Sequence, residues 1–183
     1  MLEINFKPYP ILETDRLLFR RVTEADVNEI LELRSNPETM KYIPRPLLKN
    51  TDDALEHYKM IDNAIENNTG INWAITLKGN PKLIGITGFY RIQPENYRAE
   101  IGYMILPEFH GKGIVTESIQ RLVQYAFDEM KLHSIEAVID PDNIASERVL
   151  QKCNFIKEAH FKENEFFDGK FWDSVIYCIL NKK

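Results

Sequence analysis

The chain lacks the residues from which a cross-linked or membrane-embedded protein would be built. Its 183 residues include only two cysteines, Cys153 and Cys178, which form no CxxC motif and no disulfide framework. We expect both to be buried free thiols. No apolar run approaches the ~20 residues that a membrane-spanning helix needs, and the N-terminus shows no apolar signal segment. These absences argue against a membrane partner and predict a cytoplasmic protein.

An excess of positive charge is also missing. The chain has 23 Lys and Arg against 28 Asp and Glu, so its formal net charge is -5 at pH 7. Nothing is left over to neutralise phosphates, and we expect no direct nucleic-acid partner. The histidines have no partner spacing that suggests a metal or a catalytic triad, and we expect no metal. His57 is expected to be solvated. The 44% of hydrophobic residues can fill one core, which predicts a single domain over residues 1–183.

Hydrophobic periodicity alternates between the helical and the strand pattern along the chain. Apolar residues at helical spacing predict helices that begin near residues 24, 51, 113 and 143. In the first helix Val27, Ile30, Leu31 and Arg34 share one face, and in the second the Thr51 hydroxyl is the expected cap. Residues 37–50 contain Pro44 and Pro46 and predict an irregular substrate-side loop.

Strand patterns fill most of the remaining chain. They cover residues 16–22, 71–77, 82–92, 99–106, 133–139 and two stretches between 155 and 180. Asp168-Gly169 is hairpin chemistry and predicts a tight turn between the last two strands. Gly85 and Gly88, inside one strand, indicate a bulge or a close backbone approach. The order of elements predicts an α/β (α+β) fold with mostly antiparallel strands.

The stretch LPEFHGKGIVTES, residues 106–118, joins a predicted strand to a predicted helix through Gly111-Lys112-Gly113. In such a junction backbone N–H groups and the positive end of a helix dipole converge on one spot. Glycine is needed there because a Cβ would keep an anion away from the backbone. The alternative is a loop whose glycines only turn the chain.

Two known phosphate motifs do not match this loop. A P-loop needs Ser or Thr directly after Gly-Lys, where this chain has Gly113. A dinucleotide fingerprint needs a third glycine where Thr116 stands, and it belongs early in a βαβ unit. A third interpretation is a pyrophosphate held by the successive backbone amides of His110, Gly111, Lys112, Gly113, Ile114, Val115 and Thr116.

Five segments carry a resemblance to a known family. They are TDRLLFRRVTEAD, GITGFYRI, AEIGYMILPEFHGKGIVTES, DPDNIASERVLQKCNF and FFDGKFWDSVIYCIL, and together they span most of the chain from about residue 14. In this order they resemble the GCN5-related N-acetyltransferase (GNAT) superfamily, and more closely its RimJ/RimL-like branch. The resemblance implies a mixed, mostly antiparallel central sheet of six to seven strands, flanked by about four helices. It also implies a splayed strand pair for CoA and acetyl-CoA as the cosubstrate.

The resemblance assigns the cofactor-binding residues one by one. Gly113 matches the glycine of the superfamily loop, whereas His110 and Val115 stand where Gln or Arg and Gly or Ala are typical. Both departures are tolerable because backbone amides bind the pyrophosphate, and Lys112 can add a contact to phosphate. By the same match, the residues on the pantetheine side are Tyr103, Met104, Ile105, Asn143 and Ser146. Asn143 is equally natural as the cap of the helix that follows it.

The implied reaction is direct transfer of acetyl to a primary amine. An ammonium must first lose a proton, so a carboxylate is wanted, and Glu100 and Glu165 both match positions where the family pattern offers one. The leaving thiolate wants a proton. Many family members place a Tyr seven residues after the Asn, but this chain has Leu150 there. The RimL-like pattern then assigns that role to Ser146.

The acceptor stays open at this point. A protein N-terminal amine of the ribosomal-protein type is one candidate, and a polyamine, an amino acid or an aminoglycoside is another. A non-catalytic acyl-CoA-binding module is a further alternative, because the usual acid is absent. Long C-terminal strands in this superfamily often pair across subunits, so a homodimer is also expected.

Overall fold

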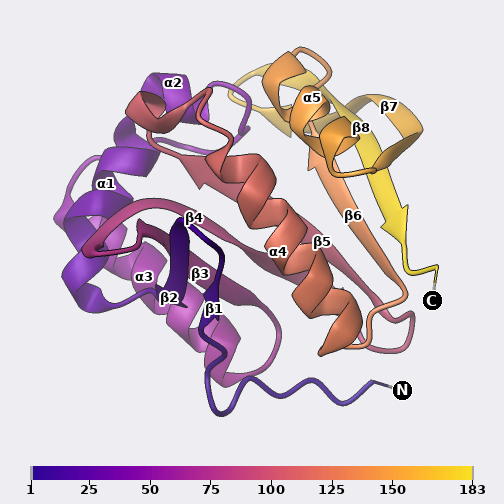
Figure 1. Ribbon diagram of the computed structural model, residues 1–183. Helices are drawn as coiled ribbons and strands as arrows, with labels where there is room; N and C mark the ends of the chain where they lie inside the picture. Colours follow the sequence, from indigo (N-terminus) through magenta and orange to yellow (C-terminus); the bar gives the residue numbers. More distant parts are fainter. Residues whose placement is uncertain (1, 183) are drawn as a thin grey trace.

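The computed structural model describes residues 2–182, and within them the chain forms one eight-stranded sheet with helices on both faces (Figure 1). The mixed α/β fold class is therefore confirmed. The strands are β1 (Leu12–Glu13), β2 (Leu17–Arg21), β3 (Ile71–Leu77), β4 (Asn80–Gln93), β5 (Arg98–Ile105), β6 (Ser134–Ile139), β7 (Ile156–Phe167) and β8 (Lys170–Leu180). The α-helices are α1 (Val27–Ser35), α2 (Pro37–Met40), α3 (Thr51–Glu66), α4 (Ile114–Asp128) and α5 (Ile144–Lys152). In this part of the chain no helix is long and apolar enough to span a membrane.

The sheet order is β1-β2-β3-β4-β5-β6-β8-β7, and β5–β6 is the parallel pair among otherwise antiparallel neighbours. β5 pairs with β6 only at Arg98, Ala99 and Glu100, although β5 continues to Ile105. β6 meanwhile stays paired with β8 up to Ile139. The two parallel strands therefore diverge after Glu100, and this is the splayed pair that the resemblance implies.

Three local predictions need correction. The sheet has eight strands over the described residues and not six to seven, because Leu12–Glu13, for which no strand was predicted, pairs with β2 as β1. The loop predicted over residues 37–50 begins with α2, since Pro37 occupies a first-turn position and the Asn36 side chain accepts the Glu38 N–H at 2.9 Å. The cap of α3 is Asn50, which accepts the Asp53 N–H at 3.0 Å, and Thr51 is already helical.

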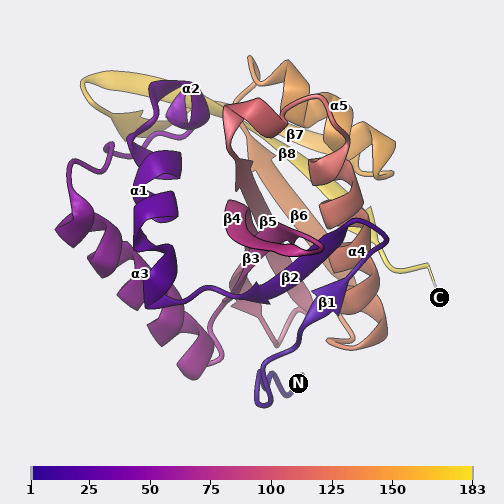
Figure 2. The same cartoon turned by 60° about the vertical axis from the view of Figure 1, so that its left-hand side comes forward.

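The helices form two layers around the sheet. α1, α2 and α3 lie on one face, and α4 and α5 lie on the other (Figure 2). Trp73 of β3 lies in the core between the layers and is fully buried. Its ring packs edge-on against Phe89 of β4 and Tyr125 of α4, and its Nε1 donates to the Pro10 carbonyl at 2.7 Å. The two cysteines are buried and free, as predicted.

Both expectations for the glycines of β4 are confirmed. The β3–β4 register shifts between Ile75, which lies opposite Gly85, and Leu77. At Gly88 the neighbouring strand approaches so closely that a Cβ would lie 2.1 Å from the Ile71 carbonyl oxygen. These glycines therefore allow β3, β4 and β5 to lie closer together than side chains would permit.

The last two strands form the predicted hairpin. Asp168 and Gly169 take left-handed φ values of 50° and 74°, as a type I′ turn requires. The tip of this hairpin reaches towards α2 and the segment after it (Figures 1 and 2). There Arg45 lies 3.6 Å from the Glu165 carboxylate. Residues far apart in the sequence thus enclose a space beyond the open ends of β5 and β6.

Candidate active site

The loop before α4 presents unpaired backbone amides. Gly111 and Gly113 have φ values of 72° and 75°, and no side chain of residues 2–182 caps the helix. The helical hydrogen-bond ladder begins with the Glu117 N–H, which donates to the Gly113 carbonyl at 3.0 Å. The three preceding helical amides, those of Ile114, Val115 and Thr116, therefore have no helical acceptor. This geometry can hold an anion.

The side chains of the loop fix its shape. The His110 ring turns back to the end of β5, where its Nε2 lies 3.2 Å from the Ile105 carbonyl, so that the Nε2–H tautomer donates. The Lys112 ammonium lies over the Phe109 ring, 5.2 Å from its centroid. His110 thus couples the loop to β5, and its backbone N–H donates to the Pro107 carbonyl at 3.0 Å, so this amide is already engaged.

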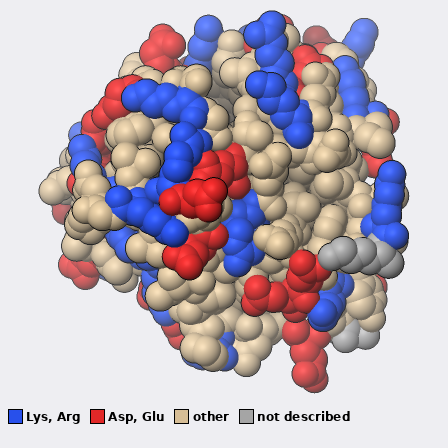
Figure 3. All heavy atoms as spheres, in the orientation of Figure 1, with Lys and Arg blue, Asp and Glu red and all other residues tan. Residues whose placement is uncertain are grey.

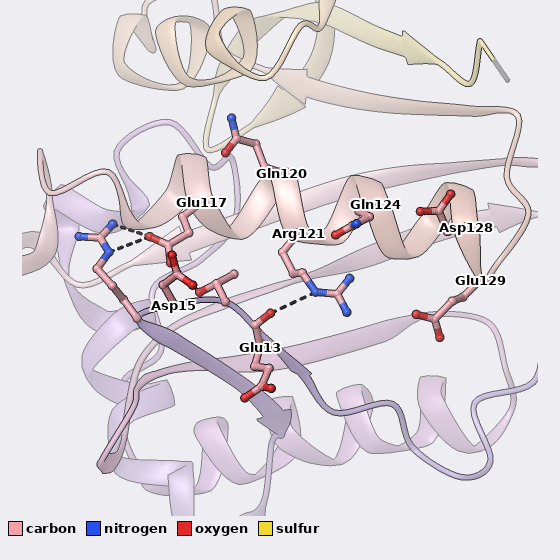
Figure 4. Close-up of a pocket in the computed structure, with 10 residues that line it drawn as sticks. Glu13, Asp15, Glu117, Gln120, Arg121, Gln124, Asp128 and Glu129 are labelled. Atoms are coloured by element: carbon pink, nitrogen blue, oxygen red, sulfur yellow. Dashed lines mark hydrogen bonds and ion pairs between the residues drawn. The ribbon is translucent and has the colours of Figure 1, made fainter.

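Arg16, which the sequence did not single out, supports the loop from behind. Its guanidinium donates to the Lys112 carbonyl at 3.2 Å and pairs with Glu117 at 2.5 Å. Glu117 borders a groove of about 630 Å³ between the first strands and the outer side of α4, whose polar lining Figure 4 shows. Acidic and basic side chains are interspersed over this face of the molecule (Figure 3). The groove lies behind the loop, so we do not place the chemistry there.

Tyr103 and Ser146 meet on the face of the sheet that α4 and α5 cover. Burial raises the pKa of Tyr103 to about 12, and the nearby Ser146 side chain acts against that rise. The two hydroxyls nevertheless lack the geometry of a full hydrogen bond, so the buried Tyr103 Oη has no partner among residues 2–182. The Asn143 side chain accepts the Ser146 N–H at 3.0 Å, which confirms its role as the cap of α5.

Met104 and Glu100 project from the opposite face of β5, because side chains alternate along a strand. Glu100 lines a cavity of about 180 Å³ that Glu165 also lines. The complete lining is Tyr42, Ile43, Pro44, Arg45, Arg91, Glu100, Val138, Ile139, Asp140, Glu165, Trp172, Asp173 and Ser174. The two carboxylates predicted as alternative bases therefore lie in one cavity.

The two carboxylates differ in their surroundings. Burial raises the pKa of Glu100 above its ordinary value, and the nearby carboxylates of Glu136 and Glu165 add to that rise. Arg91, at 2.9 Å, opposes the rise without cancelling it. Glu165 lies on the hairpin, 3.6 Å from Arg45. Glu100 is thus the carboxylate whose environment favours accepting a proton more than that of an ordinary glutamate does.

Arg34 and His57 are two residues of α1 and α3 that the sequence prediction did not assign to the site. Arg34 comes from the last turn of α1, and its Nη1 lies 4.0 Å from the Met104 sulfur. His57 of α3 is not solvated as predicted but largely buried, and this burial, with the nearby Arg34 charge, lowers its pKa to about 4. A signal was present in the sequence, because Arg34 is a charged residue on the apolar face of its predicted helix.

Comparisons with known proteins agree with this geometry. The family model described as "Acetyltransferase (GNAT) domain" matches residues 16–156. A relative, the uncharacterized N-acetyltransferase YoaA of Bacillus subtilis (strain 168), is 34% identical over 175 residues, covering 96% of this chain and 99% of the relative. Among solved structures, a GNAT-family acetyltransferase from Bacillus anthracis superposes with a TM-score of 0.85 at 30% identity, covering 95% of this chain and 100% of that one. Spermidine N-acetyltransferase from Vibrio cholerae, solved with CoA and spermine, has a TM-score of 0.80 at 26% identity, covering 91% and 96%.

Proposed function

The chain belongs to the acetyltransferase (GNAT) family, and we propose that it transfers the acetyl group of acetyl-CoA directly to a primary amine within one domain over residues 1–183. The observation that carries the proposal is the divergence of β5 from β6 after Glu100. Unpaired loop amides lie at one end of the opening, and two carboxylates line the cavity beyond it. One substrate can therefore approach from each side.

The residues present suit the cosubstrate. The amides at the start of α4 can bind the pyrophosphate, and Lys112 can add a charge-assisted contact. The edge of β5 at Tyr103, Met104 and Ile105 has no β6 partner and can pair with the amides of the pantetheine arm as an added strand would. Asn143 already caps α5, and it supports the pantetheine side of the site by stabilising the turn before that helix.

A matched pair of glycine substitutions tests the pyrophosphate cradle. Gly111 and Gly79 both have left-handed φ values, and a Cβ on either meets nothing within 4 Å. We expect Gly111→Ala and Gly79→Ala each to cost roughly 1 kcal/mol of stability. Only Gly111→Ala should raise the KM for acetyl-CoA, by about 10-fold. The contacts that it disturbs are the charge-assisted hydrogen bonds from the loop amides to the pyrophosphate. Equal KM values in the two variants would contradict the cradle.

The two faces of β5 present the two groups that move protons in the reaction, Glu100 on one face and Ser146 beside the other. The Glu100 carboxylate takes a proton from the ammonium, directly or through water, and the free amine then attacks the thioester carbonyl. A C–N bond forms, the C–S bond breaks, and the departing thiolate receives a proton that Ser146, beside Tyr103, is placed to donate. We place Glu165 in the acceptor cavity, where its charge favours binding of the ammonium.

A thiol-release assay with acetyl-CoA and a panel of amines and peptides tests the function. We expect free CoA and acetylated amine to appear in equal amounts with at least one primary amine. The panel includes protein N-terminal peptides, polyamines, amino acids and aminoglycosides, since the family allows each. Tight CoA binding without turnover of any amine would instead support a non-catalytic acyl-CoA-binding module.

A homodimer remains a prediction, and the edge of the sheet supports it. β7 is an outer strand, and it exposes 67% of Ile156, 50% of Phe161 and 65% of Phe166. Apolar side chains on an unpaired edge are a surface that a second copy can cover. Sedimentation velocity should show a dimer at micromolar concentration, and a purely monomeric species would refute it.

A further inference from the structure

Arg34 has no counter-ion within the described part of the chain. Among residues 2–182 the only hydrogen-bond contact of its side chain is the weak one to the Met104 sulfur, and its Nε is buried without an acceptor. Three other partly buried arginines are paired by contrast: Arg20, Arg21 and Arg98 each lie 2.6 Å from a carboxylate. Burial accordingly lowers the pKa of Arg34. A guanidinium held in this way destabilises the free protein, because its lost hydration is not replaced.

The surroundings of Arg34 show where a missing anion would bind. Arg34, in the last turn of α1, lies on the same side of the sheet as Glu100, because its Nη1 contacts Met104, whose side chain shares a face of β5 with Glu100. Tyr90 of β4 lies opposite Glu100 of β5, and it is close enough to interact with the charge of Arg34. His57 beside it is uncharged at neutral pH, because its pKa is about 4. Arg34 is therefore the cation that faces this space without a carboxylate of its own.

The cavity lined by Glu100 favours a cation, and Arg45 of its lining is close enough to act on the Arg34 charge. Its two arginines, Arg45 and Arg91, already pair with Glu165 and Glu100. The carboxylates of Asp140 and Asp173 line the same cavity and favour a positive group. A ligand that reaches both places would thus present an ammonium to the carboxylates and an anion to Arg34.

We propose that Arg34 recognises a carboxylate of the acceptor, so that the acceptor class is an amine that also carries a carboxylate. This inference rests on the proposed acetyl transfer and sharpens it. The carboxylate belongs either to a free amino acid or to an acidic residue near a peptide N-terminus. A polyamine has no carboxylate to offer, and its second ammonium would meet the like charge of Arg34.

Kinetics with matched acceptors test the proposal. Each pair differs only in the carboxylate: amino acids against their amides, 4-aminobutyrate against butylamine, and peptides beginning Ala-Asp against Ala-Asn. We expect the wild type to favour the carboxylate member of at least one pair by about 30-fold in kcat/KM, since hydrogen bonds to charged groups are the strong ones. The pair that shows the preference distinguishes a free amino acid from a peptide.

The Arg34→Gln variant should lose this preference through a higher KM for the carboxylate acceptor. Its KM for acetyl-CoA and its rate with the neutral analogue should stay near wild type, and its melting temperature should not fall, because an unpaired charge has been removed. Arg34→Lys should keep part of the preference, and Arg121→Gln, which removes a charge on the outside of α4, should keep all of it.

The outcomes distinguish a failure of the proposed role of Arg34 from a failure of the proposed acetyl transfer. Turnover of amines without any preference for a carboxylate in the wild type would overturn the role of Arg34 and leave acetyl transfer standing. A uniform loss of rate with every acceptor in Arg34→Gln would also overturn it, because Arg34 would then act on the acetyl group. Absence of turnover with all acceptors would instead refute the proposed function itself.

Discussion

Glu100→Gln lowers kcat by about 100- to 1,000-fold, within the range that a positioned general base contributes. The substitution keeps the shape of the side chain but removes its ability to accept a proton from the ammonium. The Glu100 side chain is only 18% exposed and lines the acceptor cavity at the last β5–β6 pair, so solvent cannot easily replace it. The KM for acetyl-CoA should change less than about twofold, because Glu100 lies away from the loop amides. Steady-state kinetics with a saturating amine measure both quantities.

The pH profile gives a second, independent readout. A general base works only when deprotonated, so the wild-type kcat should rise as pH increases through the raised pKa of Glu100 and then level off. In Glu100→Gln the amine must lose its proton to solvent, and the rise should move to higher pH, towards the pKa of the amine. An unchanged profile would show that Glu100 is not the base.

Two further variants separate the neighbouring roles. Glu165→Gln should lower kcat less than Glu100→Gln does, since Glu165 lies on the β7–β8 hairpin beside Arg45 and not on the splayed strand. Ser146→Ala should lower kcat but keep the wild-type rise with pH, because it affects protonation of the thiolate. The opposite ranking of the two glutamates would move the role of base to Glu165.

Much of the fold was predictable because its signals are local. The bounds of β3 agree with the sequence pattern at both ends, and α3 and α4 begin within one residue of the predicted positions. The Asp168-Gly169 turn is a property of two residues, and so is the capping of α5 by Asn143. β1 was missed because two residues carry no periodicity and its pairing with β2 is a tertiary contact.

The acceptor side was less predictable, because it depends on which distant residues meet. Glu100 and Glu165 were candidates from different segments, and only the folded chain brings them to one cavity. Arg34 was predicted on the apolar face of its helix, but no role followed from that position. Its significance is a missing partner, and a local pattern cannot show whether a charge will be paired after folding.

Gly88→Ala should destabilise the protein by about 3 kcal/mol or more, at or above the upper end for overpacking in a well-packed core. Its added methyl would lie 2.1 Å from the Ile71 carbonyl oxygen and 2.8 Å from the Asn72 Cα. Both obstacles are backbone atoms of β3, so relief requires strands to separate and not a side chain to rotate. For a chain of this size the melting temperature should fall by roughly 6–12 °C.

Gly70→Ala is the matched control for this effect. There the added methyl would also face a backbone carbonyl, that of Phe89, but at 3.1 Å, which a shift of a few tenths of an ångström can relieve. Its destabilisation should therefore be much the smaller of the two in denaturant unfolding. Gly88 also pairs with Gly102 of β5, so strain there should spread towards the strand that diverges from β6. We expect Gly88→Ala to weaken acetyl-CoA binding even in its folded fraction, whereas equal stabilities for the two variants would show that the sheet adapts to a methyl at either place.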